Sequence, residues 1–144
     1  MNWLKRLFGR GNDEEYDETA AIARRFEWSV RALFQPVHVQ ENLFPDFVCL
    51  AEALALEFEG WRNPFLESDA RKTLTTRQLG LIKELDVQLE SMSGEGNEAL
   101  WTDEALAFAP EWAKVRERAL ALAAEMNWNS APPPIDRGDK WAQI

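Results

Sequence analysis

Apolar side chains recur along this chain every three to four residues, which is the period of an α-helix. Alternation with a period of two, which marks a half-buried strand, is nearly absent, and Val, Ile and Thr are few beside Ala, Leu and Glu. The chain has 144 residues, 46% of them hydrophobic, and this is enough to bury one core. The pattern predicts an all-α, single-domain bundle of about five to six helices.

Gly, Pro and Asn divide the chain into elements. The helical bundle is expected over residues 1–128, beginning with a short amphipathic segment (residues 1–9) that ends at Gly9 and Gly11. Helices are expected over residues 17–34, 46–61 and 76–93, then a short one capped by Thr102 and a longer one started by Pro110. Residues 129–144 are expected to form an extended, Pro-rich C-terminal tail. Docking of the segment 1–9 and of the tail stays open, although Trp141 favours a tail that packs back on the bundle.

Each long predicted helix carries an apolar stripe that is expected to face the core. The helix over residues 46–61 is apolar on further sides, which predicts a central position in the bundle. Cys49, in the same stretch, is expected to be a buried thiol. The predicted stripes comprise Ile22, Phe26, Val30 and Leu33; Phe47, Leu50, Ala51, Leu54, Phe58 and Trp61; Leu81, Ile82, Leu85, Leu89 and Met92; and Trp112, Val115, Ala119, Leu122 and Met126.

The balance of charge is acidic, with 16 Lys and Arg against 25 Asp and Glu and a formal net charge of −9. Such a charge repels nucleic acid and anionic membranes, and it favours a basic protein partner. A single cysteine cannot form an intrachain disulfide and fits the reducing cytosol. The first residues lack the order of a signal peptide, and no apolar run approaches the roughly 20 residues that span a bilayer. We therefore expect a cytoplasmic protein without stable membrane insertion.

Groups that could support catalysis are few. His38 is the only histidine, and Gln35 stands three positions before it, so the Glu-x-x-His motif of di-iron bundles is absent. Cys49 and His38 are more readily interpreted as a core thiol and a loop imidazole than as nucleophile and base. We expect no enzyme, no metal and no cofactor, and a metal-dependent enzyme is the least favoured of three hypotheses.

Two groups of charged residues are candidate partner-binding surfaces. The first combines Arg24, Arg25, Trp28 and Arg31, which could grip an acidic partner. Internal ion pairs and a packed Trp28 are the favoured interpretation of this group. The second could cover a basic active site, or could simply aid solubility. It comprises Asp86, Glu90, Glu95, Glu98, Asp103 and Glu104, with a further acidic run of Asp13, Glu14, Glu15, Asp17 and Glu18.

Four stretches of the C-terminal half carry a resemblance to a known class of protein. They are Leu81-Ile82-Lys83-Glu84-Leu85-Asp86, Ser91-Met92-Ser93-Gly94, Leu100-Trp101-Thr102-Asp103-Glu104-Ala105-Leu106 and Pro110-Glu111-Trp112. These stretches resemble small acidic bacterial immunity proteins, the partners of polymorphic and contact-dependent growth-inhibition toxins. That class has several folds and no shared binding residues, so the resemblance implies no particular contact residue.

The resemblance implies a cytosolic inhibitor that binds one toxin domain tightly and blocks its active site or its activation. The predicted function is therefore an immunity-type protein that binds and neutralises a cognate, basic bacterial toxin domain. The alternative is a helical adaptor or a phage-type inhibitor that binds another host protein. The identity of the partner, the binding face and the oligomeric state are not predicted.

Overall fold

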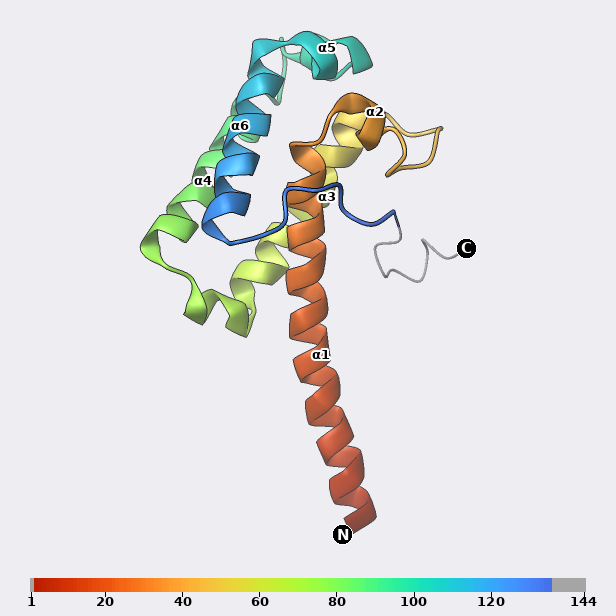
Figure 1. Cartoon of the computed structure of the whole chain (residues 1–144), viewed down its shortest axis with the longest axis vertical. Coiled ribbons are helices and arrows are strands. Elements are labelled where there is room, and N and C mark those ends of the chain that lie inside the picture. The colour runs from red at the N-terminus through yellow and green to blue at the C-terminus, as the bar shows by residue number, and fades with distance from the viewer. Residues whose placement is uncertain (1, 136–144) are drawn as a thin grey trace.

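The structure, a computed structural model, describes residues 2–135, with side chains from residue 18 onward (Figure 1). No strand occurs in this part of the chain, so the predicted all-α fold is confirmed. None of the helices within residues 2–135 is long and apolar enough to cross a membrane. The elements are α1 (Asn2–Leu33), α2 (Val37–Gln40), α3 (Leu50–Glu67), the 3-10 helix η1 (Asp69–Thr73), α4 (Thr76–Ser91), the 3-10 helix η2 (Glu98–Leu100), α5 (Asp103–Phe108) and α6 (Pro110–Glu125).

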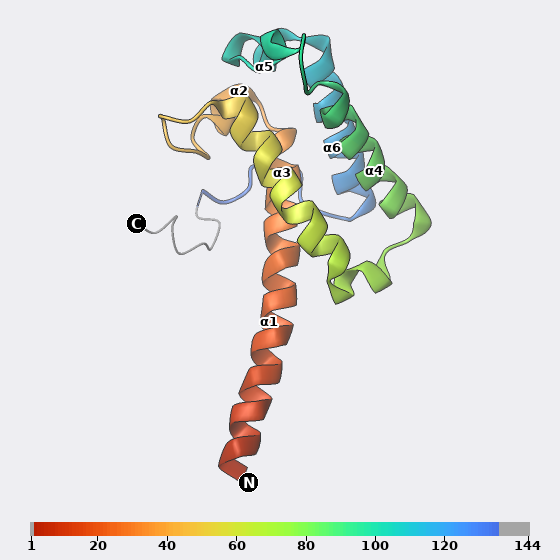
Figure 2. The same ribbon diagram turned by 180° about the vertical axis from the view of Figure 1, so that it is seen from behind.

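Helix α1 is the central element of the bundle (Figures 1 and 2). Its C-terminal half packs between α3 and α6, and α4 packs on α6. Its N-terminal half extends beyond the other helices in both views. The central position predicted for the helix over residues 46–61 is therefore wrong. That helix corresponds to α3, which leaves part of its apolar surface exposed, as at Leu56.

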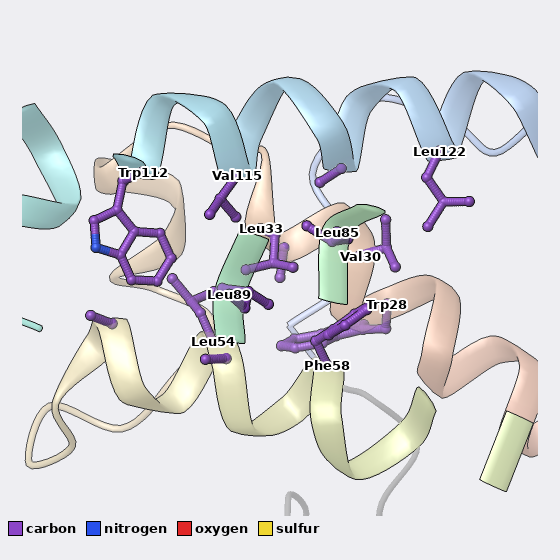
Figure 3. Close-up of a cluster of buried hydrophobic side chains, with 14 of the residues drawn as sticks. Trp28, Val30, Leu33, Leu54, Phe58, Leu85, Leu89, Trp112, Val115 and Leu122 are labelled. Atoms are coloured by element: carbon purple, nitrogen blue, oxygen red, sulfur yellow. The ribbon is translucent and has the colours of Figure 1, made fainter. Parts of the chain in front are cut away.

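The core forms where α1, α3, α4 and α6 meet, and side chains from all four helices converge there (Figure 3). Phe26 on α1 is fully buried, and its ring stacks on that of Phe65 with centroids 4.4 Å apart. Most of the predicted stripe residues are buried, and Ile22, Trp61 and Met126 are partly buried. Phe47 is the exception, because it lies in the loop before α3 and is 88% exposed.

The predicted break after residue 9 is not present, because α1 continues through Gly9 and Gly11. A glycine inside a helix costs about 1 kcal/mol relative to alanine. It lowers the stability of the helix without necessarily ending it. Residues 2–9 of the separate segment and residues 17–33 of the predicted helix are thus parts of one helix.

Helix α3 begins and ends later than predicted. Cys49 has extended backbone angles and precedes the first helical residue, so residues 46–49 lie outside the helix and Cys49 is exposed, contrary to prediction. At the other end, Pro64 lies inside α3 and the helix continues to Glu67. A proline within a helix costs about 3 kcal/mol. Burial of Phe65 against Phe26 opposes that cost and explains why the helix does not end at Pro64.

Two predicted helix starts are confirmed. The hydroxyl of Thr102 accepts a hydrogen bond from the backbone N–H of Ala105, and Pro110 is the first residue of α6. Helix α4 begins with a capping box that the sequence interpretation had not included. There, Thr75 and Gln78 each accept a hydrogen bond from the other's backbone N–H.

Residues 129–135 are the described part of the tail, and they dock on the C-terminal half of α1. The indole Nε1 of Trp28 donates to the carbonyl of Pro134 at 2.6 Å, and Arg31 donates to the carbonyl of Ala131 at 2.9 Å. Gln35 donates to the carbonyl of Ser130 at 3.2 Å, and Pro133 is buried. The remaining predicted tail, residues 136–144 with Trp141, lies outside the described residues.

Candidate protein-binding site

An apolar groove runs between α3 and the loop that precedes it. We call it the α3 groove. Its volume is about 470 Å³, and it is lined by Phe44, Pro45, Phe47, Val48, Ala53, Leu56, Glu57, Gly60 and Trp61. Its walls come from two stretches separated by one turn of α3, so the bend of the chain at residues 45–49 creates the groove.

Two large apolar side chains of the groove are strongly exposed. Phe47 is 88% exposed and Leu56 is 64% exposed. An isolated exposed apolar residue is ordinary on a protein surface, but apolar residues that share a groove mark a surface suited to a partner. Phe108 on α5, 82% exposed, and Leu120 on α6, 47% exposed, are comparable residues that do not line the groove.

The floor of the groove is held in place by contacts from α1. The ring of Trp28 meets that of Phe44 edge to face, with centroids 5.6 Å apart. The guanidinium of Arg25 lies 4.8 Å from the centre of the Trp61 ring, within the range of a cation–π interaction. The aromatic side chains of the groove therefore rest on α1, the central helix of the bundle.

Carboxylates line the groove and two hollows that adjoin it, and we call them the acidic rim: Glu41, Asp46, Glu52, Glu57, Glu59 and Asp103. Glu57 lines the groove itself. Glu52 and Glu59 border a neighbouring hollow of about 320 Å³ that shares Leu56 with the groove. Glu41, Asp46 and Asp103 border another hollow, of about 250 Å³, that shares Phe44, Pro45 and Val48 with it. An apolar surface with this rim is complementary to a partner surface that combines apolar and basic side chains.

The predicted acidic group around the end of α4 does not form one site. Asp86 is half-buried and pairs with Arg62 of α3, so it joins two helices of the bundle. Glu90, Glu95, Glu98 and Glu104 are exposed, and Asp103 alone borders a hollow next to the α3 groove. In the second acidic run Glu18 is exposed, whereas the side chains of Asp13, Glu14, Glu15 and Asp17 are beyond the part that the structure describes.

The predicted cluster of arginines and Trp28 is mostly occupied by contacts within the chain. Trp28 is 4% exposed and lies beneath Phe44 and the tail. Arg31 pairs with Glu27 at 3.0 Å and also binds tail carbonyls. Arg24 is exposed, and Arg25 lies over Trp61. The surface around Trp28 and Arg31 therefore binds the described part of the tail.

Cys49 and His38 lie on the loop before α3 and on α2 respectively. The Sγ of Cys49 lies 3.4 Å from the carbonyl oxygen of Trp101, to which it can donate. Among residues whose side chains are described, no three of His, Cys, Asp and Glu lie close enough to hold a metal ion.

Sequence interpretation missed the α3 groove, although one signal pointed to it. The stretch from Phe47 to Trp61 is apolar on more sides than one buried face requires. This surplus predicts a central helix, whereas the structure places it on an outer helix, where Leu56 is exposed. Comparisons with protein-family models, with curated proteins and with solved structures found no match for this chain.

Proposed function

We propose that this chain is an immunity-type protein that binds and neutralises a bacterial toxin domain, and that the α3 groove is its docking site. The single observation that carries the docking site is the pair Phe47 and Leu56, 88% and 64% exposed in one apolar groove bordered by carboxylates. The net charge of −9 supports a basic partner, since complementary charge speeds encounter. The toxin class rests on the sequence resemblance alone.

Phe47 and Leu56 are expected to supply most of the binding free energy, as the few residues of a binding hot spot do. Burying an exposed Phe or Leu side chain at an interface contributes about 1.5–3 kcal/mol, which is tenfold to a hundredfold in affinity. The acidic rim adds selectivity and speed of association more than affinity, because charges at the edge of an interface stay partly solvated. Apolar residues in the groove should therefore control the lifetime of the complex, and rim carboxylates should control its rate of formation.

The experiment compares capture by the tagged wild-type protein and by three variants from lysate of the native cells. The wild type and the F47A/L56A variant test the groove, and F108A and L120A are matched controls, because they truncate exposed apolar side chains elsewhere. We expect wild type and both controls to retain one protein with a basic toxin domain. We expect F47A/L56A to lose it, with an affinity reduced on the order of a hundredfold.

Three results would argue against parts of this proposal. Equal capture of the toxin by F47A/L56A would exclude the groove as the docking site. Capture of a host protein that carries no toxin domain would favour the adaptor or phage-type inhibitor instead. A captured toxin that remains active in the complex would exclude neutralisation.

A further inference from the structure

The described chain ends beside the α3 groove. The carbonyl of Pro134 accepts a 2.6 Å hydrogen bond from Trp28, and the Trp28 ring packs 5.6 Å from that of Phe44, which lines the groove. In both views the end of the described tail lies on the same side of α1 as the loop between α2 and α3 (Figures 1 and 2). Ile135, the last described residue, is 69% exposed. The described tail thus ends on the side of α1 that also carries Phe44 and the α3 groove.

The residues that follow have a chemistry that suits the groove. They read Asp136-Arg137-Gly138-Asp139-Lys140-Trp141-Ala142-Gln143-Ile144, with one large aromatic residue and two cations. Trp141 would complement the apolar lining, and Arg137 and Lys140 would complement the acidic rim. Trp141 is six positions after Ile135, and an extended chain of that length reaches roughly 20 Å. The carbonyl of Pro134 is bonded to Trp28, and the Trp28 ring lies 5.6 Å from that of Phe44 in the groove. This reach is therefore sufficient.

Docking of residues 129–135 makes the tether short. Trp28, Arg31 and Gln35 hold three successive parts of the tail to α1. A segment tethered within a few residues of its site has an effective concentration in the millimolar range. Even a weak affinity of Trp141 for the groove would then be enough to keep the groove covered.

We propose that residues 136–144 bind in the α3 groove with Trp141 as the anchor, so that the tail covers the partner-binding site until a partner displaces it. The proposed contact between residues 136–144 and the groove is argued from the position where the described tail ends and from the residues that line the groove. Its regulatory consequence rests on the proposed function, because only a partner that uses the same groove would compete.

The test of the contact uses nuclear magnetic resonance and needs no partner. Amide spectra of the full chain are compared with those of a chain truncated after Ile135, of Trp141→Ala, and of Gln143→Ala as the matched control in the same segment. We expect truncation and Trp141→Ala to shift the same amides, in residues 44–48 and 53–61, and Gln143→Ala to leave them unchanged. A synthetic peptide of residues 136–144, added to the truncated chain, should restore the shifts.

Two outcomes would overturn the contact. Shifts confined to residues near Ile135, with none in the groove, would show that the segment does not bind there. Groove shifts that depend on protein concentration, with a dimer seen by sedimentation, would show that a second copy covers the groove. The regulatory step is tested separately, once a partner is known. Truncation after Ile135 should then raise the affinity of the chain for its partner about tenfold, because the competing segment is removed. An unchanged affinity for the partner would exclude competition.

Discussion

Trp28 and Pro134 stand 106 positions apart in the sequence, and the indole of Trp28 donates a 2.6 Å hydrogen bond to the carbonyl of Pro134. This bond ties the tail to the central helix of the bundle. Trp28 also supports Phe44, so the same side chain contacts both the tail and one wall of the α3 groove. The tail and the candidate site therefore share a structural support.

Replacing Trp28 with Phe should loosen the tail while the bundle stays folded. The ring is largely retained, but a net hydrogen-bond contribution of about 1 kcal/mol is lost. Hydrogen exchange at the amides of Ala131 and Ile135 should accelerate roughly fivefold. Trp101→Phe is the matched control, because it removes an indole bond to Met92 far along the chain from the tail. If the two variants exchange equally in the tail, the bond from Trp28 does not hold it.

Phe65→Ala should be among the most destabilising substitutions in the chain. Phe65 is 2% exposed and stacks on Phe26, so its loss leaves a cavity where α1 and α3 meet. We expect the free energy of unfolding to fall by about 3–5 kcal/mol, measured by urea denaturation. Phe108→Ala, at a residue 82% exposed, should change it by less than about 0.5 kcal/mol. A small effect at Phe65 would mean that α3 ends before this residue.

Asp86→Asn should affect stability and not partner binding. Asp86 pairs with Arg62 across α3 and α4, and both side chains are partly exposed, so solvent screens the pair. We expect a loss below about 1 kcal/mol in thermal or urea unfolding. Glu90→Gln, at an exposed residue of the same helix, should leave stability unchanged. A large loss of partner affinity in Asp86→Asn, without a loss of stability, would restore Asp86 as a binding residue.

Neutralising the acidic rim should slow association with a basic partner. Glu52 and Glu59 flank Leu56, whereas Glu90 and Glu98 are equally acidic and exposed but belong to neither the groove nor its rim. E52Q/E59Q should lower the association rate constant roughly three- to tenfold at low salt, and this effect should shrink above about 0.15 M salt. E90Q/E98Q carries the same change in net charge and serves as the control. Equal slowing by both pairs would assign the effect to net charge alone.

Much of the fold could be read from periodicity, and the errors have local causes. The stripes of α4 and α6 were predicted correctly, because each has one apolar face and clear helix ends. The boundaries of α1 and α3 were wrong at Gly9, Gly11 and Pro64, residues that usually end helices. Gly and Pro disfavour a helix by about 1 and about 3 kcal/mol. Burial and the adjacent helical turns can offset these costs, and a local sequence pattern does not report either.

The candidate site was much less accessible to sequence reasoning. Charge and the position of apolar residues predicted an acidic helical bundle with a Pro-rich tail, because net charge and helical period are properties of the chain itself. The α3 groove depends on which apolar face remains uncovered after α1 has packed against α3. The roles of Trp28 and Asp86 likewise depend on residues that are 106 and 24 positions away. Contacts over such separations form only when the bundle assembles, so the helices follow from local spacing and the groove from their packing.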